Sequence, residues 1–305
     1  MVMANEPSKK QTQSFLRAKF AEIGIQPRAK LGQNFLIDLN LQHALVDAAD
    51  LQQNDVVLEV GTGTGSLSAL MAPRVASVVT VEVDANLHAL AGEELSHFDN
   101  IRMLQFDVLK NKNHLAPQLL EAVKAELDAE SGRCFKLVAN LPYHVATPLM
   151  SNLLMLDWPP RQMTVTIQKE LADRIVARPK TKDYGALSVW MQCQCRTEIL
   201  RVMSPSVFWP RPKVTSAIIQ VTLDQRLRDR IADRAYLHQF ARSMFFHRRK
   251  FLRSELLSAY KNRLGKPEVD AVIGEMGLLP TARAEELTVD QMLDLCGRMR
   301  AAVGD

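Results

Sequence analysis

The segment DVVLEVGTGTGSLS, residues 55–68, runs from a continuous apolar stretch through a turn with three glycines into a helical pattern. An apolar run without alternating polar residues is typical of a parallel strand that is buried on both faces. Gly61, Gly63 and Gly65 stand between strand and helix, where glycine permits a tight turn and close approach of a ligand to the backbone. The spacing is GxGxG, not the dinucleotide GxGxxG, because position 66 is serine. Such a turn is a weak signal alone, since many glycine turns are purely structural.

Strand and helix patterns alternate on both sides of this turn. We expect strands at 55–61, 77–84, 101–107, 136–140 and 162–168, and helices after Asp38 and at 65–72, 86–95, 111–133 and 185–192. Residues 195–203 and 213–223 can form a final antiparallel hairpin. The alternation predicts an α/β fold with a doubly wound, mostly parallel sheet. After about Asp224 the pattern is helical and basic, so we expect one domain at 1–224 and a small all-helical domain at 225–305.

Bulk composition favours a folded cytoplasmic protein. The chain has 305 residues, of which 47% are hydrophobic, and no apolar run approaches the roughly 18–20 residues of a membrane span. Residues 1–15 lack the apolar region of a secretory signal. The four cysteines are too scattered for a disulfide framework, so we interpret them as buried free thiols. The seven histidines include no HExxH, so we expect no metal site.

Two acidic residues stand at the ends of the strands that follow the glycine turn. Glu82, 21 positions after Gly61, can accept hydrogen bonds from both hydroxyls of a ribose, although Asp84 competes for that role. Asp107 ends the third strand and can accept from an adenine amino group. With the glycine turn, these acids indicate a nucleoside ligand. No P-loop lysine follows the glycines, so S-adenosylmethionine, a phosphate-free and cationic nucleoside, fits better than a nucleotide.

The segment KLVANLPYHVATP, residues 136–148, ends its strand in an amide, a proline and a phenol. The Asn140 amide oxygen and the Leu141 carbonyl can accept the two N6 hydrogens of adenine, which localises the nitrogen lone pair for attack on a methyl sulfonium. Pro142 restricts the backbone that aims the Leu141 carbonyl. Tyr143 offers a face on which an extruded base can stack. An ordinary strand-to-turn transition is the alternative for Asn-x-Pro taken alone.

Two further regions are candidate contacts to a nucleic acid. Prolines flank Phe208, so an exposed ring there could close over a target base, with Trp209 as a competitor. Residues 211–263 hold 13 Lys/Arg against four Asp/Glu, a net charge of +9, whereas the rest of the chain sums to −5. Within 243–256 helical spacing places the phenylalanines toward a core. The same spacing turns Arg248, Arg249, Lys250 and Arg253 outward, toward phosphates.

Together these motifs resemble the bacterial small-subunit rRNA adenine N6-dimethyltransferases from about Arg28 to Leu256. The matching segments are KLGQNFLID (30–38), EVGTGTGSL (59–67), EVD (82–84), FDVL (106–109), ANLPYHVATPL (139–149), QKELADRIVARP (168–179), YGALSV (184–189), FWPRPKVTSA (208–217) and HRRKFLRSEL (247–256). The combination is specific, although each piece alone is not. The insert at 111–133 and the last forty or so residues depart from the family pattern.

The resemblance implies a class I methyltransferase fold for 1–224 and an rRNA-docking role for 225–305. It implies transfer of two methyl groups from S-adenosylmethionine to N6 of each of two adjacent adenosines. These adenosines lie in the 3′-terminal hairpin loop of small-subunit rRNA, within an immature 30S particle, and the enzyme is expected to act as a monomer. The cofactor-binding residues that it implies are Asn34, Leu36, Gly61, Glu82, Asp107 and Asn140. It also supports contacts of Tyr143 and Phe208 with the target base.

Three other functions remain open from the sequence. A related class methylates adenine in large-subunit rRNA and gives macrolide resistance. A relative could instead bind RNA or DNA as an assembly or transcription factor without catalysis, although the intact glycine turn, Glu82 and the NLPY segment at 140–143 argue against it. DNA adenine methylation would require activity on duplex DNA.

Overall fold

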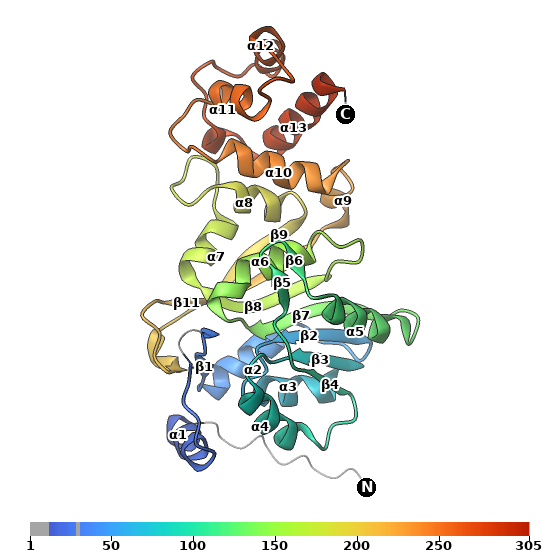
Figure 1. Ribbon diagram of the computed structural model, residues 1–305, viewed down its shortest axis with the longest axis vertical. Coiled ribbons are helices and arrows are strands. Elements are labelled where there is room, and N and C mark those ends of the chain that lie inside the picture. The colour runs from blue at the N-terminus through green and yellow to red at the C-terminus, as the bar shows by residue number, and fades with distance from the viewer. Residues whose placement is uncertain (1–11, 29–30, 305) are drawn as a thin grey trace. The chain divides into compact units, whose positions relative to one another are not determined.

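The computed structural model describes residues 12–28 and 31–304 (Figure 1). Residues 1–11, which include most of the segment judged for a secretory signal, lie outside this range. Within it, none of the helices has the length and apolar character needed to traverse a bilayer.

Seven strands form the central sheet, in the order β4-β3-β2-β7-β8-β11-β9. Their bounds are β2 (Asp55–Val60), β3 (Ser77–Val81), β4 (Ile101–Leu104), β7 (Cys134–Asn140), β8 (Gln162–Gln168), β9 (Cys195–Met203) and β11 (Ser216–Leu223). Strand β2 pairs in parallel with β3 on one side and β7 on the other, and the pairs β3–β4 and β7–β8 are parallel too. The predicted doubly wound sheet is therefore confirmed, with the last two strands adjacent at one edge.

Helices connect these strands largely where the hydrophobic periodicity predicts them. Their bounds are α1 (Gln13–Glu22), α2 (Leu39–Ala48), α3 (Ser66–Met71), α4 (Ala85–Leu95), α5 (Pro117–Asp128), α6 (Tyr143–Leu153), α7 (Lys169–Val176), α8 (Ala186–Gln192), α9 (Gln225–Arg228), α10 (Arg234–Met244), α11 (Leu252–Ala259), α12 (Lys266–Glu275) and α13 (Val289–Val303). Asp38 caps α2 as expected, because its Oδ1 accepts from the backbone N–H groups of Asn40 and Leu41.

The predicted helix over 111–133 is wrong in its first part. A short antiparallel pair, β5 (Leu109–Asn111) and β6 (His114–Leu115), precedes α5, which begins only at Pro117. Proline is well suited to the first turn of a helix, where its missing N–H leaves no hydrogen bond unmade. The predicted third strand is also too long, since β4 ends at Leu104 instead of Asp107.

Both faces of the sheet are buried at its central strands, such as β2, whereas the edge strand β9 is largely exposed. Val57, Val78 and Val138 of three neighbouring strands share one hydrophobic cluster with Leu45 of α2 and Met71 of α3. Alternate residues of β2 point to the other face and are also fully buried, and α5 packs against β2 and β3. A strand buried on both faces explains why DVVLEV shows no polar alternation.

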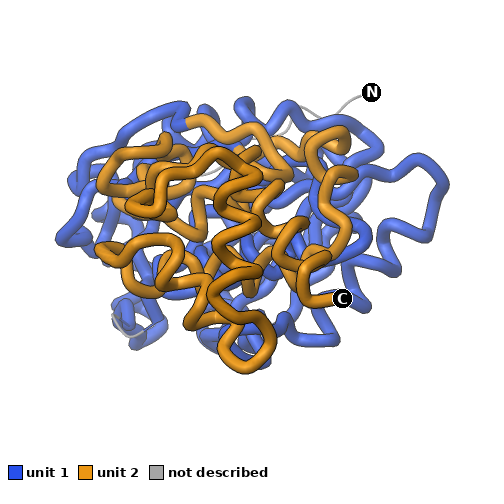
Figure 2. The backbone as a smooth tube through the Cα atoms, turned by 90° about the horizontal axis from the view of Figure 1, so that it is seen from above, with its two compact units in different colours: residues 1–169, 199–220 blue, residues 170–198, 221–305 orange. Residues whose placement is uncertain are grey.

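The chain divides into two compact units, coloured separately in Figure 2. The first comprises 1–169 and 199–220, and the second comprises 170–198 and 221–305. The second unit has a core of its own, in which Tyr184 and Val189 join residues of α10 to α13. The unit boundary therefore differs from the predicted division at Asp224, because α7 and α8 group with the C-terminal helices.

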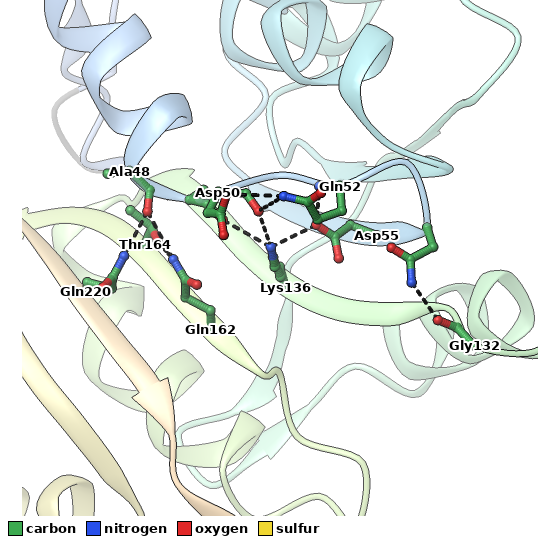
Figure 3. Close-up of polar contacts among 11 residues, drawn as sticks. Ala48, Asp50, Gln52, Asp55, Gly132, Lys136, Gln162, Thr164 and Gln220 are labelled. Atoms are coloured by element: carbon green, nitrogen blue, oxygen red, sulfur yellow. Dashed lines mark hydrogen bonds and ion pairs between the residues drawn. The ribbon is translucent and has the colours of Figure 1, made fainter.

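A buried ion pair lies at the end of the sheet where the central strand β2 begins (Figure 3). Lys136 Nζ lies 2.8 Å from Asp55 Oδ2, and their side chains are only 7% and 2% exposed. The same ammonium donates to the carbonyls of Ala49 and Asp50, which follow the last turn of α2. The neighbouring Ala48 carbonyl accepts from the side-chain amides of Gln162 and Gln220. These contacts satisfy the C-terminal carbonyls of α2 and fix that helix to the sheet.

We expect Lys136→Met to lower the free energy of unfolding by about 3–5 kcal/mol, because Asp55 would remain buried without its partner. Urea denaturation measures this loss, and the double variant with Asp55→Asn should regain part of it. Lys124→Met is the matched control. Lys124 pairs with Asp128 at 2.5 Å, but both side chains are about half exposed, so we expect less than about 1 kcal/mol. Equal effects at Lys136 and Lys124 would contradict this account.

Candidate functional site

The glycine turn after β2 forms the floor of a pocket at the carboxyl ends of the strands. Gly61 has φ +86° and Gly63 has φ +59°, conformations that side-chain-bearing residues rarely adopt. A Cβ at Gly61 would stand 3.3 Å from Pro142 Cδ, and one at Gly63 would stand 3.2 Å from Phe35 Cε1. Glycine is therefore required here for backbone conformation and for close packing of the segments that surround the pocket.

Glu82 faces the pocket immediately after β3. Its Oε2 accepts from the N–H of Gly63 at 2.9 Å, and its Oε1 accepts from the N–H of Asp84 at 2.9 Å. Burial raises the pKa of Glu82 above its usual value, and these two backbone N–H groups counteract the rise. Each carboxylate oxygen retains a lone pair for a hydroxyl group of a ligand.

Asp84, the alternative to Glu82 as the ribose-binding acid, instead caps a helix. Its Oδ1 accepts from the N–H groups of Asn86 and Leu87 and so caps α4. Its Oδ2 lies 3.4 Å from Arg28 Nε, and it does not line the pocket. The geometry therefore favours Glu82 over Asp84 as the ligand-facing acid.

Asp107 also lines the pocket, although it lies in the loop after β4 and not at the strand end itself. The side chain is exposed, and its Oδ1 accepts from the Leu109 N–H at 2.9 Å. That contact holds the carboxylate within the loop 106–108 that borders the pocket. The prediction that Asp107 contacts a base remains a prediction.

Asn140 ends β7 within the same pocket, as the sequence pattern predicts. Its side-chain amide nitrogen donates to the backbone carbonyl of Asn34 at 2.8 Å. Because this contact uses the nitrogen, it orients the amide oxygen of Asn140 as the free acceptor. Asn34 was predicted only from the family resemblance, and the structure places its backbone next to Asn140.

The residues after Asn140 are held from two neighbouring strands. The Leu141 N–H donates to the carbonyl of Thr166 on β8 at 3.1 Å. Pro142, with φ −57°, then occupies the N-cap position of α6. The Tyr143 hydroxyl lies 2.7 Å from Ser216 Oγ, and Ser216, the first residue of β11, is fully buried. Sequence reasoning missed Ser216, because nothing in a local pattern pairs a serine with a tyrosine 73 positions earlier.

Phe208 does not present its ring at the surface, so the prediction of an exposed ring is wrong. The ring is 3% exposed and packs in the hydrophobic cluster that includes Leu36 and Met203. Phe208 and Trp209 form β10, which pairs antiparallel with β1 (Phe35–Leu36). Contact of Phe208 with a base remains a prediction from the resemblance.

The pair β1–β10 holds residues 31–36 beside the glycine turn. The Trp209 ring stacks on Phe35 with ring centroids 6.2 Å apart, and Phe20 of α1 contacts both. Leu36 itself is buried and lines a smaller cavity beneath the turn, whereas Asn34 and Phe35 line the main pocket. The position of this N-terminal segment therefore depends on residues almost 175 positions later.

Beneath the turn, Glu59 of β2 organises a buried hydrogen-bond network. Its Oε2 accepts from the hydroxyl of Thr80 at 2.7 Å and from the hydroxyl of Ser68. Thr62 in the turn lies 2.6 Å from Thr80 Oγ1, so the network reaches the pocket floor. Burial raises the pKa of Glu59 to about 7, against the lowering effect of the two hydroxyl donors.

The lining of the pocket fits a nucleoside without phosphates. It offers backbone groups, the carboxyl groups of Glu82 and Asp107 and apolar side chains, and no Lys or Arg among its described residues. Among the described lining residues a phosphate group would find neither Lys nor Arg, with His144 as the one basic side chain, whereas a sulfonium would be favoured by the acids. Elsewhere, the described residues form no group of three or more His, Cys, Asp or Glu suited to a metal ion. The S-adenosylmethionine predicted from the sequence therefore fits this donor set.

The four predicted RNA-contacting cations, all in the second unit, differ in their surroundings. Arg248 donates to Glu285 and to the carbonyls of Thr181 and Lys182. Arg253 forms a two-pronged pair with Asp270. Arg249 and Lys250 are exposed, and their side chains have no partner within the described residues.

Comparison with known proteins identifies relatives along nearly the whole chain. A sequence model of the ribosomal RNA adenine dimethylase family matches residues 24–300. The ribosomal RNA small subunit methyltransferase A of Pediococcus pentosaceus is 38% identical over 286 residues, which cover 93% of each chain. The protein of the same description from Geobacillus thermodenitrificans is 37% identical over 277 residues, 90% of this chain and 92% of that one.

Two solved structures share the fold. A dimethyladenosine transferase from Plasmodium falciparum superposes with a TM-score of 0.70 at 20% identity, covering 85% of this chain and 94% of its own. The 23S rRNA methyltransferase ErmE gives a TM-score of 0.59 at 22% identity, covering 87% and 99%. At these identities the likeness concerns the fold alone.

The Glu59 network predicts a pH-dependent stability. The pKa of Glu59 in the folded protein, about 7, is above the ordinary value of 4.5 for a glutamate side chain. Between these pH values the folded state keeps a proton that the unfolded state has lost, so the free energy of unfolding falls as pH rises. We expect this fall to be smaller in Glu59→Gln by on the order of 3 kcal/mol, as measured by urea denaturation across pH 4.5–8. The exposed Glu121→Gln is the control, and parallel curves for wild type and Glu59→Gln would refute the assignment.

Proposed function

Because this chain belongs to the ribosomal RNA adenine dimethylase family, as the match over residues 24–300 shows, we propose that the pocket at the strand ends is its methyl-transfer site. The protein is an S-adenosylmethionine-dependent rRNA adenine dimethyltransferase that acts on small-subunit rRNA. The description of its family gives the adenine dimethylation, and the names of its relatives give methylation of small-subunit rRNA. One observation carries the assignment of the site. Asn140 has its amide nitrogen held by Asn34, beside Glu82 and the glycine turn, within one pocket.

The chain's own residues prepare adenine N6 for reaction. When bound, S-adenosylmethionine supplies an electrophilic methyl group on a positively charged sulfur. The Asn140 amide oxygen and the Leu141 carbonyl accept the N6 hydrogens, which draws the nitrogen lone pair out of conjugation and aims it at the methyl carbon. Transfer would join N6 to that methyl carbon as the carbon's bond to sulfur breaks, with the electron pair of that bond kept by sulfur and the proton on N6 released to solvent. Repetition on the monomethylated nitrogen gives N6,N6-dimethyladenosine.

The cofactor contacts that we propose come from the glycine turn and the two acids. The turn backbone at Gly61 allows the ligand to lie against it, and Glu82 accepts the ribose hydroxyls. Asp107 accepts from the adenine amino group of the cofactor. Asn34 closes this side of the pocket, and Leu36 lines the smaller cavity beneath the turn, both within the segment that β10 holds in place.

In this proposal the target adenine stacks on Tyr143. The position of that adenine in the rRNA is taken from the family resemblance. The targets are two adjacent adenosines in the 3′-terminal hairpin loop, presented by an immature 30S particle in the cytoplasm to a monomeric enzyme. The basic helical residues 225–305 dock on the rRNA.

Unmethylated particles, incubated with the protein and labelled cofactor, should show dimethyladenosine in 16S rRNA by mass spectrometry. Modification of naked large-subunit RNA instead would favour the macrolide-resistance activity. Modification of duplex DNA would favour DNA adenine methylation.

We expect Asn140→Ala to reduce methyl transfer on the order of 10²- to 10³-fold, because one acceptor for the N6 hydrogens is lost. Particle binding should remain within about twofold of wild type, since docking uses other surfaces. The control is Asn54→Ala. The side-chain amide of Asn54 likewise donates to a backbone carbonyl, that of Gly132 (Figure 3), but these two residues lie where β2 and β7 begin, at the opposite end of the strands from Asn140. Unchanged transfer in Asn140→Ala would refute this role, and equal loss of binding and transfer would point to a folding defect.

The hydrogen bond between Tyr143 and Ser216 predicts a non-additive pair of substitutions. Tyr143→Phe keeps the stacking face but loses the hydroxyl, and Ser216→Ala removes the other partner. Each should lower kcat/KM about 2- to 10-fold, and the double variant should be no worse than the poorer single variant. Tyr143→Ala should lower kcat/KM considerably more, because the aromatic ring on which the base stacks is removed. Additive single effects would show that Ser216 acts independently of Tyr143.

A further inference from the structure

The turn between α10 and α11 exposes two aromatic rings where the sequence pattern predicts core residues. Helix α10 ends at Met244 and α11 begins at Leu252, so residues 243–256 are not one helix. Phe245 does face the core and contacts the Tyr184 ring edge-on. Phe246 is 78% exposed and Phe251 is 44% exposed. The prediction that these two rings face a core is therefore wrong.

The turn is anchored by two of its own residues and at its C-terminal end. The Arg248 guanidinium donates to Glu285 Oε2 at 2.5 Å and to the Thr181 carbonyl at 2.7 Å, and it also contacts the Lys182 carbonyl. The side chain of His247 lies 3.2 Å from the buried Glu255. The Leu252 N–H donates to the carbonyl of Ala282 at 2.8 Å. The Phe246 ring meets the His247 ring edge-on, with centroids 4.7 Å apart, and is otherwise exposed.

Two cations lie between the exposed rings in sequence. Arg249 and Lys250 are exposed and have no hydrogen bond or ion pair from their side chains within the part of the chain that the structure describes. Their neighbour Arg248 differs, since its charge is already opposed by Glu285. The turn 246–251 thus offers two aromatic faces and two uncompensated positive charges, with an arginine as its internal anchor.

This combination matches the chemistry of single-stranded nucleic acid. Unpaired bases stack on exposed aromatic faces, and neighbouring cations neutralise the backbone phosphates. A protein partner would be better served by a broader apolar surface with few unpaired charges at its centre. We propose that Phe246 stacks on an unpaired rRNA nucleotide, next to the phosphate contacts already expected of Arg249 and Lys250.

The proposal rests on the rRNA substrate assigned above, and it predicts different effects for the rings and the charges. Phe246→Ala should weaken binding to unmethylated 30S particles about tenfold without changing the salt dependence. Phe246→Trp should retain wild-type affinity, because it keeps an aromatic face. Replacing Arg249 and Lys250 with alanine should weaken binding. It should also make the decrease of log K for particle binding with log salt concentration less steep, by roughly 1.5 in the magnitude of the slope.

Leu279→Ala is the matched control for removal of an exposed apolar side chain. Leu279 is 71% exposed in the same unit, and we expect its replacement to leave affinity unchanged. Thermal unfolding of each variant should equal that of wild type, since the side chains removed make few contacts. If Phe246→Ala binds as well as Leu279→Ala while wild type methylates the particles, the stacking role is refuted but the enzymatic function stands. If wild type neither binds nor methylates the particles, the proposed function itself fails.

The identity of the partner is tested separately. A photo-cross-linking phenylalanine analogue placed at position 246 should attach to 16S rRNA within the particle, at an unpaired nucleotide. Attachment to a ribosomal protein would overturn the proposal, as would attachment only within base-paired helices. The same analogue at position 279 provides the background.

Discussion

The parallel pairing of β2 with both β3 and β7 is the constraint on which the rest of the site depends. Leu58 is opposite Val79 on one side and Leu137 on the other, so the three strands run side by side toward the same edge. Glu82 and Asn140 then meet the glycine turn that begins at Gly61, although they are far apart in sequence. The buried pair Lys136–Asp55 supports this alignment from the opposite edge, where it fixes α2 to β2 and β7. Stability and chemistry are thus separated along the same strands.

The site is completed by segments that lie outside these three strands. The pair β1–β10 brings residues 31–36 to the pocket, and the Asn34 carbonyl then orients the amide of Asn140. Strand β11 contributes Ser216 to Tyr143 in the same way. In both cases a group that touches the pocket is aimed by a residue distant in sequence. A reactive arrangement of this kind relies on preorganised acceptors, which need partners that restrict their orientation.

The second unit has a different physical character. Its helices pack around a core of their own, and its surface carries an excess of positive charge. Net charge alone does not identify contacts to RNA, because some of the cations are occupied within the unit. Arg253 is paired with Asp270 and Arg248 holds a turn, whereas Arg249 and Lys250 remain available for phosphates. The exposed rings beside them suggest that binding there combines charge neutralisation with stacking.

The sequence by itself determined the doubly wound sheet and the glycine turn, and it predicted the acceptor role of Asn140, because each depends on local periodicity or on a residue at a strand end. Glu82 was identified in the same way, although only the structure separated it from Asp84, whose carboxylate caps α4. The burial of Phe208, the partner of Tyr143 and the exposure of Phe246 were decided by tertiary structure alone. Each depends on which distant segments pack together, and a hydrophobic pattern reports how apolar a segment is without reporting what covers it. The same limit explains the unit boundary, since α7 and α8 resemble other connecting helices in sequence but belong to the same compact unit as the C-terminal helices.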